Sequence, residues 1–337
     1  MAHYFLGMDI GNTKSHALIA DQEGHVLGVG TAGCGSPEVP RMGYEVMGYD
    51  LYAEALQYLL DQALSQAALK PADITAGGFG VAGYDWPSQE VPCLAGIHAL
   101  GLGGPVKLVN DALVGLAAGA PAGWGIGLVA GTGSNCWGMN EKGRIGRMTG
   151  MSHLMDEGGG AGHLVLWALQ AVGRAWTLRG PQTLLTDLFL QHFGETEVIS
   201  MLDRISTQHD LLDPSLAPLV ISAAETGDAV ALQVIQQAVE SLASLCLGVA
   251  RQLDLVEDKA FDVVLIGSVY NAGEVFLKPL RLAIHQTLPG ARLLRLETLP
   301  VVGGVVLAAR QVETNLSPDA LSCMRKETNL AFSNHED

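Results

Sequence analysis

The stretch Ile126-Gly-Leu-Val-Ala-Gly-Thr-Gly-Ser-Asn-Cys-Trp137 reads as an apolar strand that breaks into a polar, glycine-rich turn. It has a counterpart 120 positions earlier, where Gly11 aligns with Gly131 and the segment reads Leu6-Gly-Met-Asp-Ile-Gly-Asn-Thr-Lys-Ser15. A strand, not a helix, follows each turn, so neither turn is a Walker loop or a Rossmann fingerprint. The repeat predicts two matching hairpins whose glycine and hydroxyl tips hold phosphate from two sides.

Composition places the 337-residue chain among globular proteins large enough for two domains. Hydrophobic residues make up 48%, yet no apolar run approaches the ~20 residues that span a bilayer. The first predicted strand begins close to Met1, so we expect no signal peptide, no membrane anchor and a cytoplasmic location. The five scattered cysteines include no CxxC pair, which suits a reducing compartment and predicts no disulfide framework and no zinc site. A net charge of −16 argues against nucleic acid as a partner.

The order of the predicted elements is also duplicated. The first half is expected to begin with a three-stranded meander over residues 4–10, 16–20 and 25–30, followed by a loop over 33–43. A helix over 52–69, a strand over 77–81, a helix over 88–100 and a strand over 106–110 are expected next. The second half repeats this order with larger insertions, as a meander over 126–150, a helical region over about 164–255, and strands near 263–266 and 293–296. Parallel strands joined by helical crossovers predict an α/β fold with mixed sheets flanked by helices.

Five motifs in this order resemble those of the actin, hexokinase and Hsp70 (ASKHA) ATPase superfamily: Asp9-Ile-Gly-Asn-Thr-Lys14, Asn110-Asp-Ala112, Gly131-Thr-Gly-Ser-Asn135, Ile266-Gly-Ser268 and Gly303-Gly-Val-Val-Leu-Ala308. Within it, the chain is most similar to the BadF/BadG/BcrA/BcrD ATPase family, which includes N-acetylglucosamine kinase. The stretches that carry this resemblance are 80–85, 131–136, 155–159 and 217–228. The resemblance covers about 4–312.

That resemblance implies duplicated ribonuclease H-like (actin-like ATPase) domains with mixed five-stranded sheets on either side of an interdomain cleft. The expected domains cover 1–116 and 117–325, the second with the helical insertion, and a polar, frayed tail covers 326–337. The implied activity is ATP-dependent phosphorylation of an amino sugar, with N-acetylglucosamine converted to its 6-phosphate. ATP and Mg²⁺ are the implied cofactors, and a homodimer is the implied assembly.

The same resemblance assigns roles to individual residues. Asp111 would be the general base, and Asp9 would hold Mg²⁺ through water. The residues implied to bind or approach the nucleotide are Gly11, Asn12, Thr13, Lys14, Gly131, Thr132, Gly133, Gly267, Ser268, Gly303 and Gly304. The residues implied to bind the sugar are Ser36, Asp111, Ser134, Asn135, Asp156 and Glu157. Among the nucleotide set, Gly303 and Gly304 would let a helix approach closely at the hinge.

Several of these residues also have simpler interpretations. Asp111 could instead be a helix cap, although its motif favours a catalytic role, and Asp156 and Glu157 could be the acidic start of a helix. Asp9 is harder to explain without a ligand, because a carboxylate in an apolar strand is costly unless it is paired or bound to metal. Ser36 stands where N-acetylglucosamine kinases carry an asparagine, so the contact to the sugar's C2 substituent stays open.

Other functions remain as alternatives. The acceptor could be glucosamine, another hexosamine or N-acetylmuramic acid. An ATPase activator of a CoA-ester reductase or dehydratase would bind a [4Fe-4S] cluster through paired cysteines. No two of the five cysteines are close enough in the sequence to form such a pair. They are Cys34, Cys93, Cys136, Cys246 and Cys323. A regulator that binds DNA would need a helix-turn-helix before the first strand. The leading prediction is therefore an amino-sugar kinase.

Overall fold

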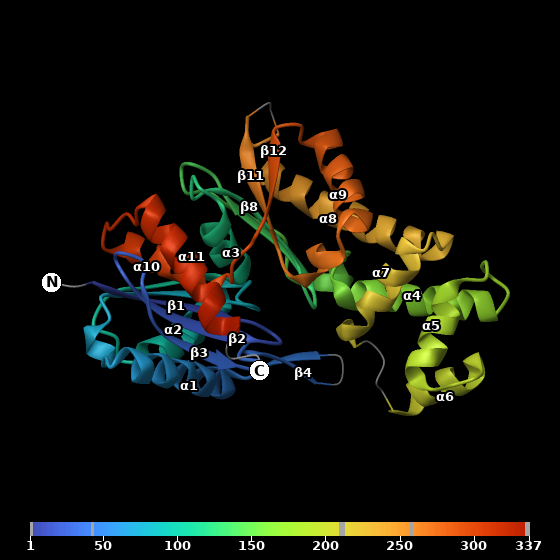
Figure 1. Ribbon diagram of the computed structural model, residues 1–337, viewed down its shortest axis with the longest axis horizontal. Coiled ribbons are helices and arrows are strands. Elements are labelled where there is room, and N and C mark those ends of the chain that lie inside the picture. Colours follow the sequence, from blue (N-terminus) through green and yellow to red (C-terminus); the bar gives the residue numbers. More distant parts are fainter. Residues whose placement is uncertain (1–2, 42–43, 209–212, 257–258, 334–337) are drawn as a thin grey trace.

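The computed structural model describes residues 3–41, 44–208, 213–256 and 259–333, and it contains two five-stranded sheets with helices on their faces (Figure 1). In each sheet, three strands form an antiparallel meander, and two further strands extend it parallel to the first. The predicted duplicated α/β architecture with mixed five-stranded sheets is confirmed.

The first sheet has the order β3-β2-β1-β6-β7. Its strands are β1 (Tyr4–Ile10), β2 (Ser15–Asp21), β3 (Val26–Ala32), β6 (Ala76–Val81) and β7 (Val106–Asn110). The crossovers are α1 (Tyr49–Ala67) and α2 (Glu90–Ala99), with 3₁₀ turns η1 (Pro71–Asp73) and η2 (Pro87–Gln89). Helix α1 buries the apolar face predicted from its spacing, including Leu56, Leu59 and Leu60, against this sheet.

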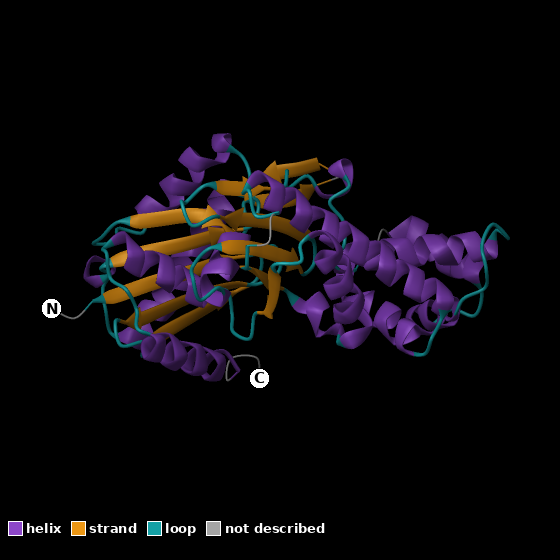
Figure 2. Ribbon diagram, turned by 90° about the horizontal axis from the view of Figure 1, so that it is seen from above, coloured by secondary structure: helices purple, strands orange, loops and turns teal. Residues whose placement is uncertain are grey.

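The second sheet has the matching order β10-β9-β8-β11-β12. Its strands are β8 (Gly125–Ala130), β9 (Ser134–Met139), β10 (Ile145–Arg147), β11 (Phe261–Ile266) and β12 (Ala291–Arg295). Between β10 and β11 lie η3 (Ser152–Met155), α4 (Ala161–Trp176), α5 (Leu184–Phe193), α6 (Val198–Gln208), η4 (Pro214–Leu216), α7 (Ala217–Glu225) and α8 (Ala229–Gln252). Between β11 and β12 lie η5 (Ser268–Ala272) and α9 (Glu274–Thr287). Figure 2 shows the helical region extending beyond the sheets as a lobe.

The two halves exchange helices at their junction. Helix α3 (Asp111–Gly119) follows the last strand of the first sheet and contacts β8, β9 and β11 of the second. Helix α10 (Val301–Gln311) follows the second sheet and packs on β1 and β6 of the first, where Figure 1 shows it beside the blue strands. Each half is therefore anchored to the other by the helix that follows its last strand.

Two consecutive glycines let helix α10 approach both α3 and β1 closely. A Cβ at Gly303 would overlap the carbonyl oxygen of Val114 in α3, and one at Gly304 would come within 2.8 Å of Gly7 Cα. Only the absence of a side chain allows backbones to approach this closely. Gly303 and Gly304 thus bring α10 against both α3 and β1.

Helix α8 is long and apolar enough, by length and composition alone, to cross a membrane. This differs from the expectation that no apolar run approaches that length. Residues along α8, among them Val239, Leu242 and Cys246, are fully buried in the hydrophobic core of the second half. The helix is hydrophobic because it passes through a protein core.

Two local expectations are wrong. The loop expected over 33–43 contains a strand, β4 (Glu38–Arg41), which pairs with β5 (Tyr44–Met47). The segment expected to be frayed from 326 belongs, as far as 333, to helix α11 (Pro318–Ser333), and residues 334–337 lie outside the described ranges. Thr328 and Phe332 are buried beneath α11. The buried residues of α11, these two among them, recur every four positions within a polar stretch and give only a narrow apolar stripe.

Candidate active site

Three carboxylates gather where adjacent parallel strands of the first sheet end. Asp9 lies near the end of β1, Asp85 follows β6, and Asp111 is the first residue after β7. The carboxyl ends of parallel strands are where open α/β sheets place ligands. Gly80 of β6 stands between Asp9 and Asp111, and a Cβ there would come within 3.4 Å of Asp111 Cα. Asp85 is not among the residues predicted to bind ligand or to react.

These carboxylates influence one another's protonation. Burial, and next repulsion by Asp111, raise the pKa of Asp9 to about 8. Burial, and next repulsion by Asp85, raise the pKa of Asp111 to about 7. Burial also raises the pKa of Asp85, although Asn135 and Arg147 act in the opposite direction. A group with a pKa near neutrality is suited to accept and release protons at physiological pH.

Asp9 fits a hydrated divalent cation. Among the described residues, no hydrogen bond or ion pair engages its carboxylate, and Asp111 adds a second negative charge nearby. Buried carboxylates are stabilised by pairing or by metal coordination. Mg²⁺ takes oxygen ligands and keeps several of its waters, so one carboxylate on a strand could hold it together with the phosphates of a bound nucleotide.

Asn110, not Asp111, caps helix α3. The Asn110 side-chain oxygen accepts a hydrogen bond from the Ala112 amide at 3.0 Å, and Asn110 has the extended backbone of an N-cap residue. Asp111 also accepts from the Ala112 amide at 3.0 Å, so its carboxylate is held at the helix start. The cap interpretation therefore explains Asn110 and leaves the position of Asp111 unexplained.

Asp85 joins the two halves of the molecule. Its Oδ1 accepts from Asn110 Nδ2 at 3.2 Å and from Asn135 Nδ2 of β9 at 3.3 Å. Its backbone oxygen accepts from Arg147 of β10. Asp85 ends the stretch 80–85 that carries part of the family resemblance, which is the signal that could have identified it.

Arg147 sits between two aromatic rings. Its guanidinium carbon lies 4.8 Å from the ring centre of Trp86 and 5.1 Å from that of Trp137. Such cation–π stacking fixes the position of the guanidinium group. The charge of Arg147 opposes part of the rise that burial causes in the pKa of Asp85, so the second half favours the ionised form of this carboxylate.

The tips of the two predicted hairpins meet. The hydroxyl oxygens of Thr13 and Thr132 lie 2.9 Å apart. Around Gly131 and Gly133 there is open space, because a Cβ at either would have no atom within 4 Å. The second tip is braced by α4, whose first amide, that of Ala161, donates to the Gly131 carbonyl at 2.8 Å. Asn12, Thr13 and Lys14 at the first tip are exposed.

The loop after β10 is fixed by Glu157. Its buried carboxylate accepts from the backbone amides of Thr149 and Gly150 at 2.6 and 2.9 Å. Ser134 donates its hydroxyl to the Glu157 carbonyl at 2.8 Å. Glu157 and Ser134 thus shape the loop, whereas Asp156 is exposed with a left-handed backbone at φ 58°. None of the three starts a helix.

The remaining predicted residues occupy three different places. Ser36 is buried, and its hydroxyl donates to the Ala82 carbonyl at 2.9 Å. Gly267 is exposed with φ 113°, beside the backbone of Gly131, and Ser268 follows it. Gly303 and Gly304 are buried within the α10 contact described above. The contribution of the last four residues to nucleotide binding, and that of Ser36 to sugar binding, stay predictions.

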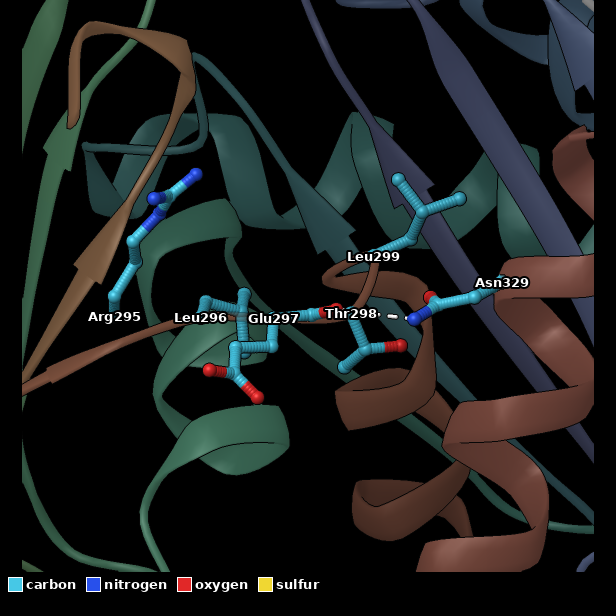
Figure 3. Close-up of a pocket in the computed structure, with 6 residues that line it drawn as sticks. All are labelled: Arg295, Leu296, Glu297, Thr298, Leu299 and Asn329. Carbon is cyan, nitrogen blue, oxygen red and sulfur yellow. Dashed lines mark hydrogen bonds between the residues drawn. The ribbon is translucent and has the colours of Figure 1, made fainter. Parts of the chain in front are cut away.

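Two of the cavities that flank helix α11 differ in their relation to the predicted site. One of about 1160 Å³ is lined in part by Thr13, Lys14 and Phe332, so it adjoins the first hairpin tip. The other, of about 470 Å³, lies along the segment between β12 and α10 (Figure 3). There Asn329 donates to the Glu297 carbonyl at 3.1 Å. The second cavity contains no residue predicted for the active site.

Two known proteins are similar to nearly the whole chain. N-acetylmuramic acid/N-acetylglucosamine kinase of Clostridium acetobutylicum is 25% identical over 319 residues, which are 92% of this chain and 99% of the relative. N-acetyl-D-glucosamine kinase of Dictyostelium discoideum is 26% identical over 317 residues, 90% of this chain and 97% of the relative.

Solved structures share the fold. A putative N-acetylglucosamine kinase from Chromobacterium violaceum superposes with a TM-score of 0.67 at 22% identity, covering 90% of this chain and 98% of its own. A ROK family glucokinase from Streptomyces griseus, solved with glucose and AMPPNP, gives a TM-score of 0.60 at 19% identity, with coverages of 92% and 100%. The model of the BadF/BadG/BcrA/BcrD ATPase family matches residues 6–308, nearly the whole described chain. The chain therefore belongs to the BadF/BadG/BcrA/BcrD ATPase family.

Proposed function

We propose that the protein is an ATP-dependent kinase that phosphorylates N-acetylglucosamine on its 6-hydroxyl. The observation that carries this proposal is the meeting of the Thr13 and Thr132 tips beside the carboxylates Asp9 and Asp111. Phosphoryl transfer requires mainly alignment and neutralisation of charge, together with a group that accepts the hydroxyl proton. Both full-length relatives described above carry names of amino-sugar kinases.

In this mechanism the hairpin tips hold the phosphates of ATP. The backbone amides of 12–14 and 132–133 would approach the phosphate oxygens, and the open space at Gly131 and Gly133 leaves room for them. The amides of Gly11 and Gly131 donate within their own turns. The hydroxyls of Thr13 and Thr132, which now contact each other, would turn to the phosphate between them. Bound Mg²⁺, held at Asp9, would supply positive charge to the outer phosphates.

Asp111 accepts the proton of the acceptor hydroxyl. As that oxygen forms its bond to the γ-phosphorus, the bond from phosphorus to the β-bridging oxygen breaks, and ADP leaves. The proton ends on the Asp111 carboxylate, whose pKa of about 7 suits this transfer. Asp85 acts through its charge, which raises the pKa of Asp111.

The sugar would lie beside the Asp85 network. Asn135 donates to Asp85 and accepts from the Cys136 amide at 2.8 Å, so its amide is already oriented. A sugar hydroxyl can share these partners, as small-ligand sites combine few but fixed polar groups. Ser36 already donates to Ala82, so the acetamido group would need another donor than the Ser36 hydroxyl.

N-acetylmuramic acid is a second candidate acceptor, because one relative is named for both sugars. The test is incubation of the protein with ATP and Mg²⁺ and, in turn, N-acetylglucosamine, N-acetylmuramic acid, glucosamine and glucose. We expect the release of ADP to depend on an N-acetylated sugar, and mass spectrometry to find the sugar phosphate. Release of ADP at the same rate with and without every sugar would contradict the proposal. Gel filtration with light scattering would test the expected homodimer.

A further inference from the structure

A second cluster of ligand-type side chains lies on the surface, away from the hairpin tips. It joins His25, at the turn between β2 and β3, to Cys323 and Glu327 of helix α11. His25 Nδ1, Cys323 Sγ and a Glu327 oxygen all lie within 4.8 Å of one another. Imidazole, thiolate and carboxylate are the three ligand types that zinc uses in proteins.

The separations within the cluster match the edges of a zinc tetrahedron. Zinc bonds of about 2.3 Å to sulfur and about 2.0–2.2 Å to nitrogen and oxygen imply edges of about 3.6 Å to sulfur and about 3.4 Å between nitrogen and oxygen. Here Sγ of Cys323 lies 3.6 Å from His25 Nδ1 and 3.4 Å from Glu327 Oε1. His25 Nδ1 lies 3.3 Å from Glu327 Oε1. One ion can therefore contact all three atoms with little movement.

Neighbouring hydrogen bonds hold two of the ligands in place. The second oxygen of Glu327 accepts from the Val26 amide at 2.8 Å, which leaves Oε1 directed at the cluster. Asp21 Oδ1 accepts from the amides of Glu23 and His25 at 3.0 and 2.9 Å and so fixes the turn. Partners of this kind, outside the ligands themselves, orient metal sites.

The surroundings also suit a cation. Asp21 and Glu23 add negative charge beside the cluster, in a chain whose net charge is −16. The site is open to solvent, because the His25 side chain is 58% exposed. An ion has a path of entry, and a water molecule can fill the fourth position.

We propose that His25, Cys323 and Glu327 form a Zn²⁺ site that fastens helix α11 to the first sheet. A thiolate ligand favours zinc over Mg²⁺ or Ca²⁺, which prefer oxygen alone. Helix α11 carries Phe332, whose ring contacts His16 edge-on with centroids 5.0 Å apart, and it lines the cavity beside Thr13 and Lys14. Zinc would thus stabilise one wall of that cavity without joining phosphoryl transfer.

The test measures metal binding by the full-length protein, stripped of metal and kept reduced with a phosphine. Titration with Zn²⁺ against a chromogenic chelator should show one site, and Co²⁺ should give the absorption of a tetrahedral ion with a thiolate ligand. Zn²⁺ should also raise the thermal unfolding midpoint. Loss of even an outer partner of a metal site weakens binding about 10- to 100-fold. Removal of a ligand in Cys323→Ser or His25→Gln should therefore weaken binding at least about tenfold.

Matched controls are Cys34→Ser and His98→Gln, which change an exposed cysteine and an exposed histidine elsewhere. Both should bind Zn²⁺ as the unchanged protein does. Circular dichroism should show that all four variants are folded, since the changed side chains lie at the surface. If the unchanged protein binds no stoichiometric Zn²⁺, or if Cys323→Ser and His25→Gln bind it equally well, the cluster is only a set of hydrogen bonds and the proposal is wrong.

Discussion

The hydroxyl oxygens of Thr13 and Thr132 lie 2.9 Å apart, although 119 residues separate them along the chain. Each stands at the tip of a glycine turn at the end of an apolar strand, one in each half of the molecule. The duplicated hairpins thus meet as a pair, which is the arrangement needed to hold one phosphate chain from two sides.

Thr132→Val should raise the KM for ATP about tenfold or more, because a hydrogen bond to a charged group contributes roughly 1.5–3 kcal/mol. Thr132→Ser keeps the hydroxyl and should retain most of the affinity. Steady-state kinetics with ATP varied at saturating sugar would measure both. An unchanged KM in Thr132→Val would mean that this tip does not bind phosphate.

Asp111→Asn should lower kcat about 10²- to 10⁴-fold, the usual contribution of a general base. Nucleotide binding should persist, because Asn110 supplies the cap of α3. Calorimetry with a non-hydrolysable ATP analogue would establish binding, and coupled ADP release would give kcat. The control is Asp187→Asn, an exposed acid on α5. Turnover of Asp111→Asn at the unchanged rate would refute the assigned role.

Asn135→Ala should raise the KM for the sugar far more than the KM for ATP. Asn135 lies on strand β9, beyond the tip that would hold phosphate, and its amide donates to Asp85 at 3.3 Å. The two KM values, measured separately, decide the matter. The opposite split would place Asn135 with the nucleotide.

The pH dependence should report on Asp111. Its pKa is raised to about 7, and a general base acts only when deprotonated, so kcat/KM for the sugar should rise with pH through neutrality. Asp85 contributes to this raised pKa by repulsion. Removal of that charge in Asp85→Asn should therefore move the rise to lower pH. Asp187→Asn should leave the profile unchanged, and a shift to higher pH in Asp85→Asn would contradict the explanation.

Gly303→Ala should destabilise the protein by about 1–3 kcal/mol, because the new methyl group would overlap the Val114 carbonyl. Gly173→Ala is the matched control, since it lies in helix α4 with open space around it. It should stabilise by roughly 0.5–1 kcal/mol through helix propensity. Urea unfolding midpoints at equal m-values would compare them. Equal effects would show that α10 can move away from α3.

Local patterns were enough to predict most of the fold. Strand β1 and helix α1 appear where the apolar pattern predicted them. The spacing of apolar residues along the chain decides which side chains of an element can be buried together. Strand β4 was missed because its four residues include a proline and follow a stretch rich in Gly and Pro, so they carry little periodic signal. Helix α11 was missed because its buried residues, such as Phe332, are few within a polar segment.

The candidate site was predicted less completely. Asp111 and Thr132 belong to motifs whose residue types and order are informative in the sequence. Asp85 gains its importance from Asn110 and Asn135, which lie 25 and 50 residues further along the chain. The family-like stretch 80–85 could have drawn attention to Asp85. Its pairing with partners so far apart leaves no local pattern along the chain.

The sequence by itself determined the duplicated strand-turn-strand units and the presence of glycines at their tips, since both follow from local periodicity and backbone freedom. Only the tertiary structure decided that α3 and α10 are exchanged between the halves, and that Asp85 links them. It alone brought His25 to Cys323, 298 positions away. Contacts of this kind depend on how packed elements meet in space, which is a property of the folded chain as a whole.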